Sequence, residues 1–136
     1  MRFLLDTNII SELRKGMRAN PGVRDWFHPL DDPDLYTSVL VEGELRHGIE
    51  LKRLRDPTAA AHLERWLATV VTHYSERIIP IDSRVAQLWG QLGVPDPIPI
   101  IDGLLAATAI VHDLTLVTRD IDAVRRTGVR VMNPFE

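Results

Sequence analysis

Short apolar runs alternate with longer amphipathic stretches along the chain, and this alternation predicts strands that are followed by helices. Residues 3–5 (Phe-Leu-Leu) are apolar throughout, as in a strand buried on both faces. Residues 58–74 instead repeat apolar side chains at the 3.6-residue spacing of a helix. By the same reasoning, we expect strands at residues 3–5, 35–37, 78–81 and 114–117, and a fifth at 129–131.

Polar and proline positions indicate where the helices begin. Ser38 fits the N-cap of a helix over residues 39–53, and Asn20 before Pro21 predicts a helix that begins at Pro21. The expected helices cover residues 9–15, 21–28, 39–53, 58–74, the stretch from the Asp82-Ser83 cap to about Leu92, residues 101–112, and a short segment after Asp120. This order favours an α/β fold with a mostly parallel central sheet of four to five short strands, flanked by helices in three α/β/α layers.

Composition and charge exclude several classes of protein. A chain of 136 residues with 45% hydrophobic residues can bury one core and is not disordered. The absence of cysteine excludes disulfides, thiolate zinc sites and a cysteine nucleophile. The net charge of −3 means that any nucleic acid must be held at a local site rather than by bulk charge. No apolar run reaches the roughly 18 residues of a membrane span, so we expect a cytoplasmic protein with no membrane partner.

Four acidic residues lie where a parallel sheet binds ligands or where a carboxylate is unexpected. Asp6 directly follows the first strand, and Asp120 follows the strand at 114–117 after two polar residues. Ligands of open parallel sheets bind outside the carboxyl ends of the strands. Glu44 and Asp102 lie within apolar helical segments, where a lone desolvated carboxylate would be costly.

Each acid also has a purely structural interpretation. Asp6 and Asp102 could cap the helices that follow them, Glu44 could lie on a solvated helix face, and Asp120 could be a turn residue. By spacing alone, Glu42 and Asp122 could replace Glu44 and Asp120. No single acid therefore defines a site.

The order of the motifs resembles that of the PIN-domain ribonucleases, and among them the VapC-like toxins of bacterial toxin–antitoxin pairs. The similarity spans nearly the whole chain, so residues 1–136 are expected to form a single PIN-like domain. The matching stretches are residues 5–12 (LDTNIISE), 38–48 (SVLVEGELRHG), 101–109 (IDGLLAATA), 116–120 (LVTRD) and the closing segment 128–135.

The resemblance implies a catalytic set of Asp6, Glu44, Asp102 and Asp120. Glu44 rather than Glu42 matches the family pattern Glu-Leu-x-x-Gly, through residues 44–48. The fourth position is often asparagine in these toxins, so Asp120 adds a negative charge. Where family members often carry an Asp-Phe pair, this chain has Ala123-Val124, and Asp122 is left outside the core site.

This set implies a divalent metal ion and hydrolysis of RNA phosphodiester bonds. Carboxylate oxygens favour Mg²⁺ or Mn²⁺, and a cation offsets the repulsion among clustered acids. Asp6 and Asp102 are expected as direct ligands, with Glu44 and Asp120 in contact with the ion or with its waters; one metal ion or two remains open. The five histidines show no helical pair that would indicate zinc.

Phosphate contacts and protein partners follow from the same resemblance. Arg46 and Arg119 adjoin Glu44 and Asp120 and are candidates to contact RNA phosphates. Thr7, Asn8 and Thr118 could add a hydroxyl or amide contact to RNA or to metal-bound water, although Thr118 could equally end its strand as a cap. The family further implies a small cognate antitoxin protein and a homodimer. Other basic residues cluster at 14–24, 52–55 and 125–130.

Three other functions fit parts of the pattern. A phosphatase with an aspartate nucleophile usually needs Asp-x-Asp, but Asn8 stands at the second position. A receiver-like domain needs a late lysine, and the only lysines are Lys15 and Lys52. A catalytically inactive PIN-like module that binds RNA or protein is disfavoured by the presence of all four acids. Metal-dependent RNA cleavage would separate the nuclease from these alternatives.

Overall fold

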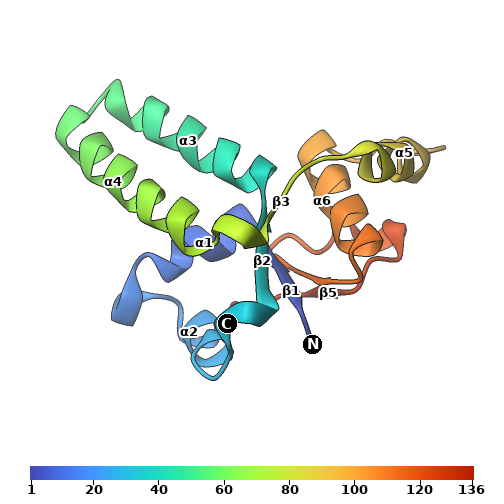
Figure 1. Ribbon diagram of the computed structural model, residues 1–136, viewed down its shortest axis with the longest axis horizontal. Coiled ribbons are helices and arrows are strands. Elements are labelled where there is room, and N and C mark those ends of the chain that lie inside the picture. The colour runs from blue at the N-terminus through green and yellow to red at the C-terminus, as the bar shows by residue number, and fades with distance from the viewer.

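The computed structural model, which describes residues 1–136, is built on one five-stranded parallel sheet (Figure 1). Leu4 at the centre pairs with Tyr36 on one side and with Leu116 on the other. Every neighbouring pair of strands is parallel, which confirms the predicted fold class. The strands are β1 (Phe3–Leu5), β2 (Leu35–Ser38), β3 (Ile78–Ile79), β4 (Thr115–Val117) and β5 (Val131–Met132), in the spatial order β3-β2-β1-β4-β5.

Helices cover both faces of the sheet and give the three predicted layers (Figure 1). The chain moves outward from β1 to β3 and then returns to the opposite side of β1. Because parallel crossovers are right-handed, this reversal places the later helices on the other face. One layer holds α1 (Thr7–Leu13), α2 (Pro21–Phe27), α3 (Val39–Arg53) and α4 (Pro57–His73), and the other holds α5 (Ser83–Leu92) and α6 (Ile100–Val111). None of these helices combines the length and hydropathy needed to cross a membrane.

The predicted caps set several helix boundaries. The Ser38 hydroxyl accepts a hydrogen bond from the Leu40 amide at 3.0 Å, and α3 runs from Val39 to Arg53 as predicted. Asn20 caps α2 by accepting hydrogen bonds from the amides of Gly22 and Val23.

Three elements differ from the predicted ones. The first helix begins at Thr7 rather than at residue 9, because the Asp6 side chain caps it. Near the end of the chain, the expected short helix is only one 3₁₀ turn, Arg125–Thr127. Gly128 follows that turn with φ +77°, so β5 begins at Val131 rather than at residue 129.

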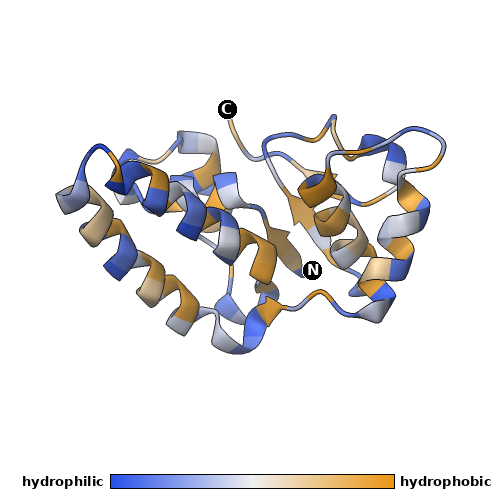
Figure 2. Ribbon diagram, turned by 90° about the horizontal axis from the view of Figure 1, so that it is seen from above, coloured by the Kyte–Doolittle hydropathy of each residue, from blue (hydrophilic) through white to orange (hydrophobic).

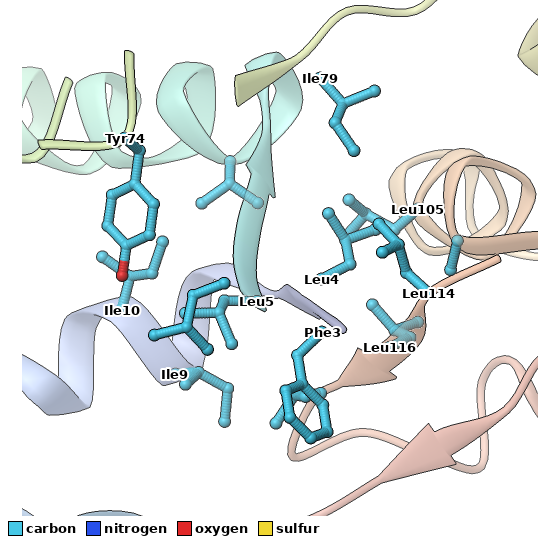
Figure 3. Packing of buried hydrophobic residues seen from close by; sticks show 14 of the residues in the cluster. Phe3, Leu4, Leu5, Ile9, Ile10, Tyr74, Ile79, Leu105, Leu114 and Leu116 are labelled. Carbon is cyan, nitrogen blue, oxygen red and sulfur yellow. The ribbon is translucent and has the colours of Figure 1, made fainter. Parts of the chain in front are cut away.

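The core lies between the sheet and the two helical layers. Leu4, Leu5 and Leu116 of the strands are fully or almost fully buried and pack with Ile9 of α1 and Leu105 of α6 (Figure 3). Burial of each such side chain stabilises the fold by about 1.5–3 kcal/mol. The strands are hydrophobic, whereas α3 and α4 mix hydrophobic and hydrophilic positions along their lengths (Figure 2). The helices that carry candidate site residues are therefore docked firmly on the sheet.

Candidate active site

The candidate site lies at the carboxyl ends of β1 and β4, which are neighbours in the sheet. Asp6 directly follows β1 and Thr118 directly follows β4. The Asp6 amide donates to the Val117 carbonyl at 3.0 Å, so the pairing of the two strands continues one residue beyond β1. The direction in which the chain builds the sheet reverses between these strands, and ligands of such folds bind at this position.

Asp6 is a buried carboxylate with only 7% of its surface exposed. One oxygen accepts a hydrogen bond from the Thr7 amide and the other from the Thr118 hydroxyl, both at 2.7 Å. Burial raises the pKa of Asp6 above its ordinary value, and the nearby carboxylates of Glu44 and Asp120 raise it further. The hydrogen bonds from Thr118 and Thr7 oppose this rise, because they stabilise the ionised form.

Glu44 is held beside Asp6 by Thr7. The Thr7 hydroxyl donates to Oε1 of Glu44 at 2.5 Å, which joins α1 to α3. Thr7 and Glu44 line a hollow of about 550 Å³ together with residues of α3 and with Ile101, which precedes Asp102. His47, which a sequence pattern would place on a helix surface, is exposed and lines the same hollow.

Glu42 faces a different part of the molecule. It lines a groove between α3 and α4 with Leu67 and Val71, away from the hollow at Glu44. Side chains two residues apart on a helix point about 200° apart, so the structure brings only one of these two glutamates to the site.

Thr118 joins the remaining parts of the site. Its hydroxyl donates to Asp6 and accepts hydrogen bonds from the Asp120 amide at 3.1 Å and from Asn8 Nδ2 at 3.4 Å. Asn8 Oδ1 in turn accepts from the Arg119 amide at 3.1 Å. Thr118 and Asn8 thus bind the Asp120 segment to α1, and Asp120 itself lies exposed at the rim.

Asp102 reaches the site from the opposite helical layer. The N-cap of α6 is Pro99, and Asp102 lies in the first turn rather than at the capping position. Asp102 is half-buried, and burial is the main cause that raises its pKa. The negative charges of Asp6, Asp120 and Glu44 add to the rise. The structure therefore brings Glu44 and Asp120 close enough to Asp6 and Asp102 for their charges to raise the pKa of those two carboxyls.

The donor set is suited to a hard cation. All four side chains offer carboxylate oxygens, the ligands that Mg²⁺ and Mn²⁺ prefer. No three acidic or histidine side chains stand close enough to surround an ion on their own. Mg²⁺ commonly keeps several of its waters and binds only one or two protein carboxylates. The residues thus fit a hydrated ion.

Arg46 and Asp122 are close to the candidate acids in the sequence but form ion pairs outside the hollow at Glu44. Arg46, predicted to contact phosphate beside Glu44, donates instead to Glu50 and Glu64 in an ion-pair network between α3 and α4. Arg46 follows Glu44 by two residues on α3, so its side chain is turned about 200° away from Glu44, toward the groove that Glu42 also lines. Asp122 is 87% exposed and pairs with Arg125.

Sequence reasoning missed one side of the site. Ser11 of α1 and Arg14, the C-cap of α1, line a second hollow of about 250 Å³ that also borders Thr7 and Glu44. The available signal was helical spacing, because Ser11 lies four residues after Thr7 on the same face of α1. The predicted helix began only at residue 9, so it did not place Thr7 and Ser11 on one helix face.

A parallel α/β sheet with carboxylates gathered at the ends of its central strands defines the class of this protein. Residues 3–129 match the PIN domain family, and the chain belongs to that family. The resemblance stated from the sequence is thereby confirmed.

Relatives along the whole chain narrow the class further. Toxin FitB of Neisseria gonorrhoeae is 34% identical over 139 residues, which cover 97% of each chain. The VapC ribonuclease Y4jK of Sinorhizobium fredii is 28% identical over 138 residues, which cover 98% of this chain and 97% of the relative. Among solved structures, FitAcB from Neisseria gonorrhoeae is similar with a TM-score of 0.87 and 34% identity, covering 97% of each chain.

Proposed function

We propose that this chain is a metal-dependent endoribonuclease and the toxin of a toxin–antitoxin pair. The observation that carries the proposal is a continuous hydrogen-bonded chain across the site. It runs from Glu44 through Thr7 and its amide to Asp6, and from Asp6 through Thr118 to the Asp120 amide. Asp102 completes the set from the other layer of the fold.

In this proposal Asp6 and Asp102 hold Mg²⁺, and Mn²⁺ can replace it. Glu44 and Asp120 either bind the ion or accept hydrogen bonds from its waters. When bound, the ion supplies positive charge that activates water and stabilises the charge developing on the scissile phosphate. The raised pKa values of Asp6 and Asp102 support this assignment, because they arise mainly from burial and also from neighbouring negative charges, and a bound cation would stabilise the ionised carboxylates against both.

Glu44 is suited to take a proton from the attacking water. Thr7 fixes its Oε1, while Oε2 accepts no hydrogen bond from the protein and can orient water in the hollow. A positioned carboxylate of this kind contributes as a general base. Thr118 orients Asp6 and favours its ionised form through its hydrogen bond, which opposes the rise in the pKa of Asp6.

The antitoxin belongs to the same proposal. The relatives include a protein named as a toxin, and similar solved structures include FitAB bound to a DNA fragment. We infer that a small antitoxin protein binds this chain and blocks its site. A homodimer stays a prediction of the family resemblance.

The two glutamates of α3 provide the sharpest test. Glu44→Gln should lower the rate of RNA cleavage by at least about 100-fold, the range of a lost general base. Glu42→Gln removes the same charge two residues away and should keep the wild-type rate. The assay uses protein freed of any copurified partner, single-stranded RNA and Mg²⁺, with circular dichroism to verify folding.

The opposite pattern of activities would show that the helix register of the site is wrong. A wild-type chain that cuts no RNA with Mg²⁺ or Mn²⁺ would refute the nuclease proposal and favour an inactive binding module.

A further inference from the structure

Two arginines beside the acidic site lie over aromatic rings in cation–π contacts and have no acidic partner. The Arg14 guanidinium lies 5.8 Å from the centre of the Trp66 ring, and the Arg119 guanidinium lies 4.7 Å from that of Phe135. Neither side chain forms an ion pair or donates a hydrogen bond within the protein, whereas Arg53 and others are engaged by carboxylates. Both guanidinium groups therefore keep all their N–H donors available.

We propose that Arg14 and Arg119 bind two phosphates of an RNA strand that crosses the acidic site, and that Trp66 and Phe135 position these arginines. This inference rests on the proposed function, because it assigns the binding residues for that substrate. It adds a defined path for the strand, on both sides of α1.

Arg14 opens onto the catalytic side of α1. It lines the 250 Å³ hollow that Thr7 and Glu44 also border, and Trp66 of α4 forms part of the same wall. A phosphate bound by Arg14 therefore lies in the hollow that Glu44 borders. Trp66 is half-buried against the core, so its ring offers Arg14 a fixed surface.

Arg119 is fixed on the other side of α1 by its backbone. Its amide donates to Asn8 Oδ1, and its carbonyl accepts from Asn133 Nδ2 at 3.4 Å. The next residue is Asp120, so the backbone that places Arg119 also places a candidate catalytic acid. Asn133 additionally accepts a hydrogen bond from the Phe135 amide, which connects the stacking ring to the same segment.

The segment that carries Phe135 is itself anchored on α2. Asn20 Nδ2 donates to the Glu136 carbonyl at 3.0 Å, and Asn20 Oδ1 accepts from the Glu136 amide at 3.1 Å. Gly22 allows this contact, because a Cβ there would lie 2.2 Å from the Pro134 carbonyl oxygen. Phe135 is thus held against the body of the protein and can position Arg119.

Charge explains why such contacts are needed. The chain carries a net charge of −3 and its site gathers four carboxylates, so neither attracts RNA. A planar guanidinium matches the geometry of a phosphate, and stacking reduces the freedom it must lose on binding. Glu12, the acid nearest Arg119 on α1, is already engaged by Lys15 and by the Asn20 amide.

The test compares charge removal with loss of stacking. Arg14→Gln and Arg119→Gln should each weaken binding of a single-stranded RNA oligonucleotide by at least about tenfold. Each should also lower the slope of log affinity against log salt by about 0.7, the value for one phosphate contact on a single strand. In cleavage assays both should raise KM with little change in kcat. Binding is measured by fluorescence anisotropy in a Glu44→Gln background, which prevents cleavage.

The aromatic variants and a control separate positioning from folding. Trp66→Leu and Phe135→Leu should weaken binding while keeping the salt slope, and Trp66→Phe and Phe135→Tyr should restore it. Arg65→Gln removes the same charge from an exposed position next to Trp66, where Arg65 contacts His62, and should bind as the wild type does.

Wild-type affinity and salt slope in both arginine variants would overturn the inference. If the wild type binds RNA through these arginines yet cuts none, the proposed function fails and the binding inference stands. If it cuts RNA with an unchanged KM in both variants, the reverse holds.

Discussion

Replacement of Thr118 by valine removes the hydroxyl at the centre of the site, which donates to Asp6 and accepts from the Asp120 amide and from Asn8. Thr118 is 2% exposed, and its hydroxyl donates to the buried carboxylate of Asp6 at 2.7 Å. Valine has nearly the same shape, so the substitution removes the hydroxyl without opening a cavity. The Asp6 carboxylate then loses one of its two hydrogen-bond donors, and only the Thr7 amide remains.

The loss of stability on removing this one hydroxyl should be large. A hydrogen bond to a charged group contributes about 1.5–3 kcal/mol, so Thr118→Val should lower the free energy of unfolding by about 2 kcal/mol. For a domain of this size that change corresponds to a fall in Tm of roughly 6–10 °C. Thr115→Val is the matched control, because Thr115 is buried in β4, which Thr118 directly follows, and its hydroxyl makes no hydrogen bond within the protein.

The stability difference between Thr118→Val and the wild type should depend on pH in a defined direction. The pKa of Asp6 is raised in the fold, mainly by burial, so ionised Asp6 lowers stability at pH values above its folded pKa. That loss disappears as the pH falls through the folded pKa toward the ordinary value of 3.8. Thr118→Val raises the folded pKa further. The difference in stability between variant and wild type is therefore greatest at high pH and shrinks as Asp6 becomes protonated in both proteins.

Thermal melts followed by circular dichroism, at a series of pH values from about 8 down to about 4, measure this difference without added metal. If Thr118→Val has the same Tm as Thr115→Val at every pH, the hydrogen bond to Asp6 does not stabilise the fold and the reasoning is refuted. A deficit that stays constant with pH would show instead that the hydroxyl acts through some group other than Asp6.

Three further outcomes are expected. Asp102→Asn should make the metal-free protein at least as stable as the wild type, because burial and three neighbouring acids disfavour the Asp102 carboxylate. The same variant should lose RNA cleavage and show a smaller rise in Tm when Mg²⁺ is added. Normal RNA cleavage by this variant would remove Asp102 from the site. Excess chelator should abolish cleavage, and Mg²⁺ or Mn²⁺ should restore it, whereas full activity in chelator would contradict a metal site. Arg46→Gln should slightly lower Tm, because it breaks exposed ion pairs to Glu50 and Glu64. RNA cleavage should stay unchanged, and a large loss of cleavage would instead support a phosphate contact by Arg46.

Local signals in the sequence were sufficient for most elements of the fold. Ser38 and Asn20 form their caps through contacts within three residues, which a linear pattern can reveal. The apolar run at residues 3–5 is central in the sheet because later strands pair with both of its edges. The spatial order of the strands follows from long-range pairing and could not be obtained from periodicity.

The contacts within the site depend on that long-range order. The hydrogen bond from Thr7 to Glu44 joins residues 37 apart, and the one from Thr118 to Asp6 joins residues 112 apart. Spacing could nominate Asp6 and Thr118 as strand ends, but it could not show that Thr118 donates to Asp6. Arg46 illustrates the converse, since it is close to Glu44 in sequence but pairs with Glu64 of α4 in the structure.

The central position of β1 has a consequence for how the protein can be divided. A break in the segment between β3 and α5 would leave Asp6 and Glu44 in the first fragment and Asp102 and Asp120 in the second. β1 would then lack the neighbour β4, and neither fragment would carry more than two of the four carboxylates. Hydrolysis would thus require both fragments to meet and rebuild the sheet. The topology therefore makes this chain a candidate for a split enzyme, whose two fragments are inactive alone and active only after they reassemble.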